Sequence, residues 1–387
     1  MSEAKLPFSR PAIGEEEIEE VVQVLRSGWL TSGPRVQRFE ADFARYVGAR
    51  HALSLTSCTA ALHLAMLAHG IGPGDEVVVP SLTWGATANA VELVGARPVF
   101  ADIDRGSLQL TVDSVVPRLS ERTRALVPVH FAGQACDVEG LAALTREHGA
   151  LLIHDAAHAA GTEYRGRRIG SDGRTACWSF HPIKNMTTGE GGMLTTDDDA
   201  LAERVRLLRF HGVNRDAWVR YGNPTSPRYE TVLPGLKYNM TDIQAALGIH
   251  QLARLDGFIE RRAALAAHYR SELAAEEALH LPVLLPDTTR HAWHLMVVAL
   301  ELGALRCDRD GFMARLAKRG IGTGLHFTAV HLHRYYRERY GHAKGDLPGS
   351  EWASERVLSL PLFPAMTEGD VERVCDAVRD VIREVKR

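Results

Sequence analysis

The chain has 387 residues, of which 45% are hydrophobic and 24% are charged, and its formal net charge at pH 7 is −3. This length exceeds what one hydrophobic core usually supports, so we expect two lobes, and the composition is that of a globular protein. The small negative charge excludes a protein-wide attraction to nucleic acid or to an anionic membrane. No apolar run approaches the ~20 residues needed to cross a bilayer, so we expect no membrane insertion.

The five cysteines are widely spaced and form no CxxC pair. This pattern argues against a disulfide framework and against a zinc site, and it favours a reducing, cytoplasmic location. His326, His331 and His333 lie close together in the sequence, but no acidic or cysteine partner stands at ligand spacing, so we expect no metal.

In chain order, an acid-rich helix start is followed by short apolar segments that alternate with helical patterns. Helices are predicted at 15–26, 59–68, 85–94 and 138–148, and strands at 51–55, 76–80, 98–102, 125–129, 151–154 and 176–180. Several of these strands lack polar and apolar alternation, which predicts a mostly parallel sheet buried on both faces. In such a sheet, ligands bind beyond the carboxyl ends of the strands.

The pattern changes near residue 255, where a smaller α+β lobe is predicted. Its expected elements are a long helix at 258–276, a strand at 294–300 and helices at 310–319 and 368–386. We therefore divide the chain into a large domain, 1–250, and a small C-terminal domain, 251–387. Residues 212–234 are rich in glycine, proline and aromatic residues without a period, which indicates a long functional loop.

Lys184 follows a buried strand and precedes a glycine-rich turn, in the segment Ser179-Phe-His-Pro-Ile-Lys. Burial at the floor of a cleft would lower the pKa of this lysine and leave a neutral amine, the nucleophile that a carbonyl cofactor needs. The alternative interpretation from position alone is a surface lysine in a loop.

Asp155 stands at the end of the apolar run Leu151-Leu-Ile, where an acid is costly unless it is paired. A pyridinium nitrogen is a suitable partner, because the carboxylate keeps the ring protonated and electron-poor. The alternative is an N-cap of the next helix. His158, one turn further on, could contact the ring hydroxyl side of such a cofactor or could be an ordinary packed histidine.

The segment 56–62, Thr-Ser-Cys-Thr-Ala-Ala-Leu, joins a strand to a helix, and its backbone N–H groups suit a phosphate. Ser179 is a second hydroxyl in reach, although serine and threonine also serve as plain caps. Trp84, just past another strand, could stack on a flat heterocycle or pack in the core. No GxGxxG or P-loop motif is present, which disfavours a dinucleotide or nucleoside triphosphate.

An ordered set of short motifs resembles the DegT/DnrJ-type sugar aminotransferases, a family of fold-type I pyridoxal-phosphate (PLP) enzymes that aminate keto-sugar nucleotides. These motifs are SCTAAL at 57–62, PSLTW at 80–84, DAAHA at 155–159, SFHPIKN at 179–185, GEGG at 189–192 and KYNMTD at 237–242. The resemblance covers nearly the whole chain. It implies an α/β fold-type I transferase with PLP as its cofactor.

The resemblance also implies roles for particular residues. Lys184 would carry PLP as a Schiff base and shuttle the proton, and Asp155 would pair with the pyridine nitrogen. Trp84 would stack on the cofactor ring. The phosphate ligands would be Cys58, Thr59 and Ser179. Asn239 would reach the phosphate of a neighbouring subunit, which implies a homodimer with shared active sites. Thr31, Ser32 and His326 are the candidates for sugar-nucleotide contacts, and packing alone is the alternative for His326.

Within the family, five segments are most similar to members that aminate a UDP-linked 4-keto-pentose for lipid A modification. They lie at 6–14, 27–34, 320–327, 335–340 and 359–367. This implies that glutamate donates its amino group, leaves as 2-oxoglutarate, and converts UDP-4-keto-arabinose to UDP-4-amino-4-deoxy-L-arabinose, with a role in lipopolysaccharide biosynthesis and antibiotic resistance.

Two departures and two alternatives accompany this interpretation. His154 stands where a Glu is more usual, and the loop at 213–231 is not a close match. Some relatives replace the lysine with histidine and act as dehydratases, but Lys184 is kept here, which favours transamination. The alternatives are a GDP- or dTDP-linked 4-keto-6-deoxyhexose as substrate, or a PLP-binding regulator without turnover.

Overall fold

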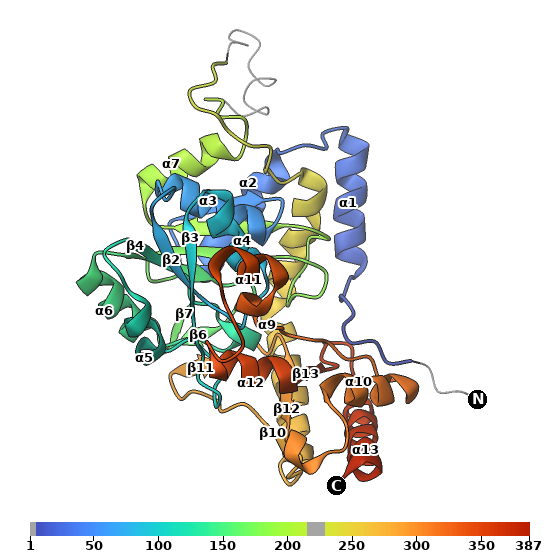
Figure 1. Ribbon diagram of the computed structural model, residues 1–387. Coiled ribbons are helices and arrows are strands. Elements are labelled where there is room, and N and C mark those ends of the chain that lie inside the picture. Colours follow the sequence, from blue (N-terminus) through green and yellow to red (C-terminus); the bar gives the residue numbers. More distant parts are fainter. Residues whose placement is uncertain (1–4, 215–228) are drawn as a thin grey trace.

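The computed structural model describes residues 5–214 and 229–387. Its large lobe is built on a seven-stranded sheet with the order β1-β9-β8-β5-β4-β2-β3 (Figure 1). The strands are β1 (His51–Leu55), β2 (Glu76–Pro80), β3 (Arg97–Ala101), β4 (Thr123–Leu126), β5 (Leu151–Asp155), β8 (Thr175–Ser179) and β9 (Gly192–Thr196). Only β9 runs antiparallel to its neighbours. The mostly parallel α/β architecture is therefore confirmed.

Helices cover both faces of this sheet, because successive strand residues point to opposite sides. Leu53 and Leu55 of β1 pack with α3 (Cys58–Ala68), α4 (Ala86–Leu93) and α7 (Asp199–Leu208). Ala52, one residue before Leu53, packs on the other face with α2 (Pro34–Val47) and the first half of α9 (Asp242–Leu273). On that second face α6 (Val138–His148) covers β2, β4 and β5. The sheet is thus the middle of three layers, and its strand ends stay accessible.

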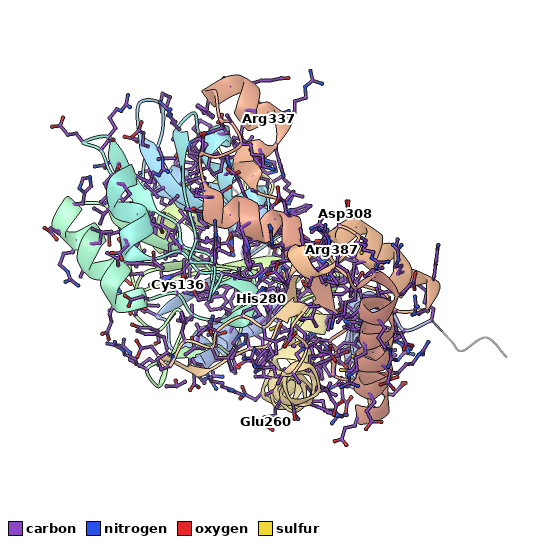
Figure 2. All side chains as sticks on the ribbon, turned by 60° about the horizontal axis from the view of Figure 1, so that its bottom comes forward. Cys136, Glu260, His280, Asp308, Arg337 and Arg387 are labelled. Carbon is purple, nitrogen blue, oxygen red and sulfur yellow. The ribbon has the colours of Figure 1, made fainter. Side chains whose placement is uncertain are left out.

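The small lobe has its own antiparallel sheet, β10-β12-β13, and its own core. Its elements are β10 (Leu279–His280), β12 (Met296–Leu300), β13 (Val357–Leu360), α10 (Arg309–Lys318) and α13 (Glu368–Val385). Figure 2 shows Asp308 and Arg387 on this lobe and Arg337 on the large one. Leu6 also packs in this core and forms a bridge with Ile321, so the N-terminal segment lies against the small lobe.

One helix, α9, belongs to both cores. Ala245, Ile249 and Leu255 pack beneath the large sheet, whereas Leu265 and Leu273 pack in the small lobe. The division proposed at residue 250 falls inside this helix, so that division stays a prediction.

The remaining elements frame the two lobes. They are α1 (Glu15–Ser27), α5 (Val112–Val115), α11 (Arg334–Tyr340), α12 (Pro348–Arg356) and a small sheet of β6 (Glu163–Tyr164), β7 (Arg167–Arg168) and β11 (Thr288–Arg290). None of the helices in the described ranges is long and apolar enough to cross a membrane.

The structure differs from the sequence-based expectations in a few elements. The long helix begins at Asp242, sixteen residues before its predicted start, because Thr241 caps it with a capping box to Gln244. Several elements were not predicted, among them the helices α2, α7, α11 and α12 and the strand β9, which lies between β1 and β8. Most of the predicted loop at 212–234 lies outside the described residues.

Candidate active site

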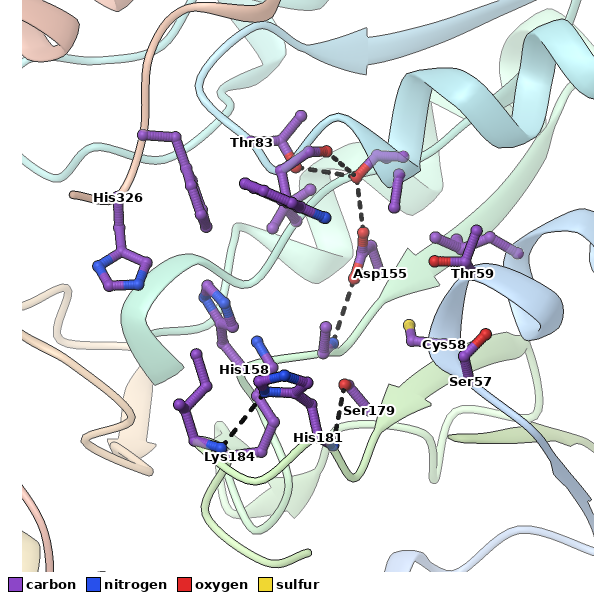
Figure 3. A pocket seen from close by; sticks show the side chains of 18 of the residues that line it. Ser57, Cys58, Thr59, Thr83, Asp155, His158, Ser179, His181, Lys184 and His326 are labelled. Atoms are coloured by element: carbon purple, nitrogen blue, oxygen red, sulfur yellow. Dashed lines mark hydrogen bonds between the residues drawn. The ribbon is translucent and has the colours of Figure 1, made fainter. Parts of the chain in front are cut away.

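A cavity of about 440 Å³ lies at the carboxyl ends of β1, β2, β5 and β8, where a doubly wound sheet places its ligands. It collects eight of the side chains predicted from the sequence: Cys58, Thr59, Trp84, Asp155, His158, Ser179, Lys184 and His326. Figure 3 labels all of these except Trp84. These residues come from separate segments of the chain, so the fold brings the predicted motifs to one place.

The N-terminus of α3 forms one wall of the cavity. Ser57 caps the helix, and its hydroxyl accepts a hydrogen bond from the Ala60 N–H at 3.0 Å. The N–H groups of Cys58 and Thr59 make no hydrogen bond within the described part of the chain. Helix N-termini with free N–H groups bind phosphate.

Gly192 on β9 allows the strand to contact the backbone at the start of α3. A Cβ at this position would lie 2.3 Å from the backbone carbon of Ser57 and 2.5 Å from the nitrogen of Cys58. Only glycine lets β9 approach the start of α3 so closely, which gives the GEGG motif a structural reason.

Asp155 ends β5 and is buried in the floor of the cavity. Its carboxylate accepts hydrogen bonds from the Thr87 hydroxyl at 2.8 Å and from the Ala157 N–H at 3.2 Å. Burial raises the pKa of this carboxyl, and the hydrogen bonds and the nearby Lys184 amine only partly counter that effect. The site therefore favours a further cationic partner for Asp155.

Lys184 lies in the turn after β8, and its side chain lines the same cavity. Burial lowers the pKa of its amine to about 8, while the neighbouring Cys58 and Asp155 act in the opposite direction. The amine makes no hydrogen bond or ion pair with the described residues. A substantial fraction is therefore neutral near physiological pH and can act as a nucleophile or base.

His158 is buried beside this lysine and is neutral. Burial, Lys184 and His326 all lower its pKa well below the ordinary value. The Ala132 N–H donates to Nδ1 at 3.2 Å, so the ring proton stands on Nε2, which is left as a donor. His158 also packs on the buried His294, with ring centroids 4.3 Å apart.

Two further predicted residues line the mouth. Trp84 is 69% exposed, and its ring lies 6.1 Å from that of Phe327, so an aromatic face is open to a planar ligand. His326 is buried, and its Nδ1 lies 2.9 Å from the Ser359 hydroxyl. Burial, with Lys184, lowers the pKa of His326 to about 3, so it is neutral.

These features fit PLP. The aldehyde needs a partly neutral lysine, the ring nitrogen needs a buried carboxylate, the ring needs an aromatic face, and the phosphate needs free N–H groups. The cavity supplies each of these with Lys184, Asp155, Trp84 and the start of α3.

Three predicted residues do not line this cavity. Thr31, Ser32 and Asn239 line a separate hollow of about 210 Å³. Asn239 Nδ2 donates to the Ser32 hydroxyl at 2.7 Å, and that hydroxyl donates to the Met240 carbonyl at 2.6 Å. Asp242 accepts from the Gly33 N–H at 2.7 Å and holds the same turn. The three residues form one unit that does not reach Lys184 within a single chain.

The sequence analysis missed several residues of the cavity. Thr87, which binds Asp155, stands one helical turn after Trp84, and that spacing is the signal that could have found it. Phe327, Leu325 and Glu190 also line the cavity. They lie in the segments 320–327 and 189–192 quoted above, but the sequence analysis gave these three side chains no role. His326, His331 and His333 have different partners, and no metal-binding group of His, Cys, Asp and Glu occurs among the described residues.

The fold and the cavity together define the class of fold-type I PLP-dependent transferases. More narrowly, the chain belongs to the DegT/DnrJ/EryC1/StrS aminotransferase family, whose model matches residues 11–379.

Individual relatives agree with this assignment. The chain is 47% identical over 379 residues to the spore coat polysaccharide biosynthesis protein SpsC of Bacillus subtilis, covering 98% of this chain and 97% of that protein. It is 39% identical to S. venezuelae DesV, solved with a ketimine intermediate, with a TM-score of 0.87 and coverage of 95% and 94%. It is 31% identical to Spr1654 of Streptococcus pneumoniae in its PLP form, with a TM-score of 0.91 and coverage of 98% and 99%. The protein is a PLP-dependent sugar aminotransferase.

Proposed function

We propose that this enzyme moves the amino group of glutamate to the 4-keto carbon of a nucleotide-linked sugar, and that a UDP-linked 4-keto-pentose is its substrate. The observation that carries the chemistry is the convergence of Lys184, Asp155 and the start of α3 in one cavity. That convergence also disfavours a binding protein without turnover, because such a protein would not need a lysine whose pKa lies near 8.

In this proposal each residue has one task. When bound, PLP supplies an aldehyde for covalent attachment and an electron-poor ring that withdraws charge from the substrate carbon. Asp155 pairs with the ring nitrogen. The N–H groups of Cys58 and Thr59, with the Ser179 hydroxyl, hold the phosphate.

Lys184 performs the proton transfer. Its Nζ would accept the proton from the α-carbon of glutamate and deliver it to the former aldehyde carbon of the cofactor in the same half-reaction, as a base with a pKa of about 8 can do near neutral pH. In the second half-reaction it would move a proton the opposite way, from that carbon to the 4-carbon of the sugar. His158 Nε2 donates a hydrogen bond toward the cofactor, and Trp84 stacks on its ring. His326, which is neutral, contacts the sugar nucleotide.

We also propose that the active site is composite. Thr31, Ser32 and Asn239 form one polar unit that is separate from the lysine in the same chain. In a two-fold homodimer this unit would complete the cavity of a second copy of the chain. Asn239 would then reach the phosphate of the cofactor, and Thr31 and Ser32 would reach the substrate.

The identity of the sugar is the finer part of the proposal. Sequence similarity at 6–14, 27–34 and 320–327 supports the UDP-linked pentose and, with it, lipid A as the destination. The second candidate is a GDP- or dTDP-linked 4-keto-6-deoxyhexose. The similarity to the spore coat polysaccharide biosynthesis protein SpsC favours a cell-surface polysaccharide over lipid A as the destination of the amino sugar.

A panel of keto-sugar nucleotides separates these candidates. The purified holoenzyme is given glutamate and either a UDP-linked 4-keto-pentose or a GDP- or dTDP-linked 4-keto-6-deoxyhexose, and 2-oxoglutarate release is measured. We expect the highest kcat/KM with the pentose. A higher kcat/KM with a hexose would move the assignment to the second candidate, and no amination of any sugar in the panel would overturn both.

A further inference from the structure

A second hollow, of about 350 Å³, lies on the far face of the catalytic strand β5. Its walls come from α6, the β6–β7 hairpin and the turn that follows β7. His154 lines this hollow, whereas the next residue, Asp155, lines the catalytic cavity. Adjacent residues of a strand point to opposite faces, so the two sites lie back to back across the sheet.

The lining of this hollow is strongly cationic, although the whole chain has a net charge of −3. It holds two acidic residues, Glu139 and Asp172, against five arginines: Arg146, Arg165, Arg167, Arg168 and Arg174. A local excess of positive charge of this kind attracts anions irrespective of the overall charge.

Most of the opposing carboxylates are already engaged. Arg165 pairs with Glu139 and, at 3.0 Å, with Asp287. Arg168 lies 3.5 Å from Asp256, and Arg174 Nη1 lies 2.8 Å from Asp172. Both acidic residues of the hollow, Glu139 and Asp172, are therefore already paired with arginines that line it.

Two arginines have no acidic partner among the described residues. The guanidinium of Arg146, on α6, makes no hydrogen bond or ion pair there, and that of Arg167 donates only to the Ser171 carbonyl, at 3.2 Å. Both guanidinium groups are exposed at the hollow. An arginine fork binds phosphate oxygens in pairs, so two such groups suit a ligand with two phosphates.

The floor of the hollow is held rigidly by a directed chain of hydrogen bonds. The Cys136 N–H donates to His130 Nδ1 at 3.2 Å, so the proton of His130 stands on Nε2. Nε2 donates to His154 Nδ1 at 3.1 Å, and His154 Nε2 then donates to Asp172 at 3.1 Å. Asp172 is thereby committed to His154 and Arg174.

The ionisation of Asp172 is secured by the same contacts. Burial opposes it, but the hydrogen bonds from His154 and Arg174 more than offset this effect and hold the pKa of the carboxyl well below its usual range. Asp172 therefore anchors Arg174 at the hollow and is not free to pair with Arg146 or Arg167.

We propose that this hollow is a binding site for a small anion that carries two linked phosphate groups, such as a pyrophosphate or the diphosphate of a nucleotide. The site is separate from the catalytic cavity and does not depend on the identity of the sugar. A volume of about 350 Å³ accommodates a small ligand, and the arginines at its rim provide the charge-assisted hydrogen bonds.

The test is isothermal titration of the PLP-saturated protein with inorganic pyrophosphate, at constant ionic strength. We expect saturable binding that weakens by about tenfold or more in the Arg146→Gln/Arg167→Gln double variant, the equivalent of losing one charge-assisted hydrogen bond or more. Orthophosphate is expected to bind at least about tenfold more weakly than pyrophosphate, because it lacks the second group.

The matched control is the Arg383→Gln/Arg387→Gln double variant, which removes the same charge at the end of the small lobe, where Figure 2 labels Arg387. It should bind pyrophosphate as the unaltered protein does. Equal weakening in both double variants would overturn the site, since it would show a general effect of charge. Unaltered binding in the Arg146/Arg167 variant, no saturable binding by the unaltered protein, or equal affinity for orthophosphate would overturn it as well.

Discussion

Lys184 and Asp155 are the residues to which we assign the chemistry in the proposed function, and burial shifts the pKa values of the two side chains in opposite directions. It lowers the pKa of the lysine to about 8 and raises that of the carboxyl. In both cases burial disfavours the charged form. The buried lysine is therefore stabilised by a reaction that removes its charge, and the buried carboxylate is stabilised by a cationic partner. A carbonyl group for the amine and a protonated ring nitrogen for the carboxylate meet both needs.

Replacing Lys184 by Ala is expected to abolish turnover, because both the attachment point and the proton carrier are lost. The fold should persist, since the side chain lines a cavity and does not fill a core. Measurement of kcat and of circular dichroism tests this. The control is Lys344→Ala, a surface lysine that pairs with Glu355 at 2.7 Å. Repeated turnover by the Lys184 variant would refute the assignment.

The same substitution has a predicted effect on the stability of the PLP-free protein. The lysine titrates at about 8 in the fold against an ordinary value of 10.5, so between these values the unfolded chain binds more protons and stability rises with pH. Below 8 the buried charge is a cost that the alanine variant lacks. At neutral pH the Tm of the PLP-free variant should therefore equal or exceed that of the unaltered protein. A clear decrease in Tm would contradict the burial of this amine.

Uptake of PLP by the PLP-free protein should depend on pH through the same group. The neutral amine is the nucleophile, so we expect the rate to rise by about tenfold per pH unit well below the pKa and to level off above it. The level is expected near pH 8. Stopped-flow absorbance after the PLP-free protein is mixed with PLP measures this rate. A rate that is constant or falls with pH would be inconsistent with the prediction.

At the residue scale, the sequence predicted the side chains that stand in recognisable motifs after strand ends. Asp155 and Lys184 are examples, because a buried acid and a lysine after apolar runs need an explanation. Phe327 and Leu325 reach the cavity through tertiary packing from the small lobe, and no local pattern predicts that. For Asn239 the resemblance implied a contact with a neighbouring subunit, which agrees with its position away from Lys184 of its own chain. The position of Thr31 and Ser32 beside it was not predicted, because the motif around them contains no information on which chain they serve.

Among the elements, the contact between β9 and the start of α3 determines the shape of the phosphate wall. The antiparallel strand β9 pairs with β1 and places Gly192 opposite Leu55, beside the Ser57–Cys58 backbone. An atom added at residue 192 must push this backbone away, because it meets main chain rather than a flexible side chain.

We therefore expect Gly192→Ala to weaken PLP binding by about tenfold or more, as the N–H groups of α3 move from their positions. Equilibrium titration of the PLP-free protein with PLP measures the dissociation constant. Gly257→Ala is the matched control, since a Cβ at that position in α9 meets nothing within 4 Å. An unchanged dissociation constant in the Gly192 variant would show that the start of α3 does not hold the phosphate.

The elements that sequence analysis found are those with strong local signals. The strands at 51–55 and 76–80 and the helix at 138–148 have the predicted bounds, because apolar runs and caps mark them. In α2 the buried residues Val36, Phe39, Phe43 and Val47 follow helical spacing, so that helix was predictable but overlooked. In β9 the opening glycine and a uniformly buried pattern hid the strand.

At the scale of the whole molecule, the proposed composite site predicts complementation between two inactive variants. Lys184→Ala and Asn239→Ala should each have low activity, the first without the amine and the second without the contact from the other copy. After exchange of subunits, half of the dimers are mixed and each mixed dimer has one intact site, so about a quarter of full activity should return.

Activity after mixing and the mass of the particle by light scattering measure this. The control mixes Lys184→Ala with Asp155→Ala, because these two residues line the same cavity of one chain and no intact site can form. Return of activity only in the first mixture supports a shared site. No return, in a dimer shown to exchange subunits, would place each site within one chain.

The helix α9 makes the two halves of the molecule mechanically continuous. Its first part packs under the large sheet and its last part packs in the small lobe, so this one helix connects the two cores without a break. A protease cut or a truncation near its middle would leave apolar side chains of both cores uncovered at once. A break at residue 250 would fall inside α9, and a change in the angle between the two lobes would have to bend this helix or pivot about it.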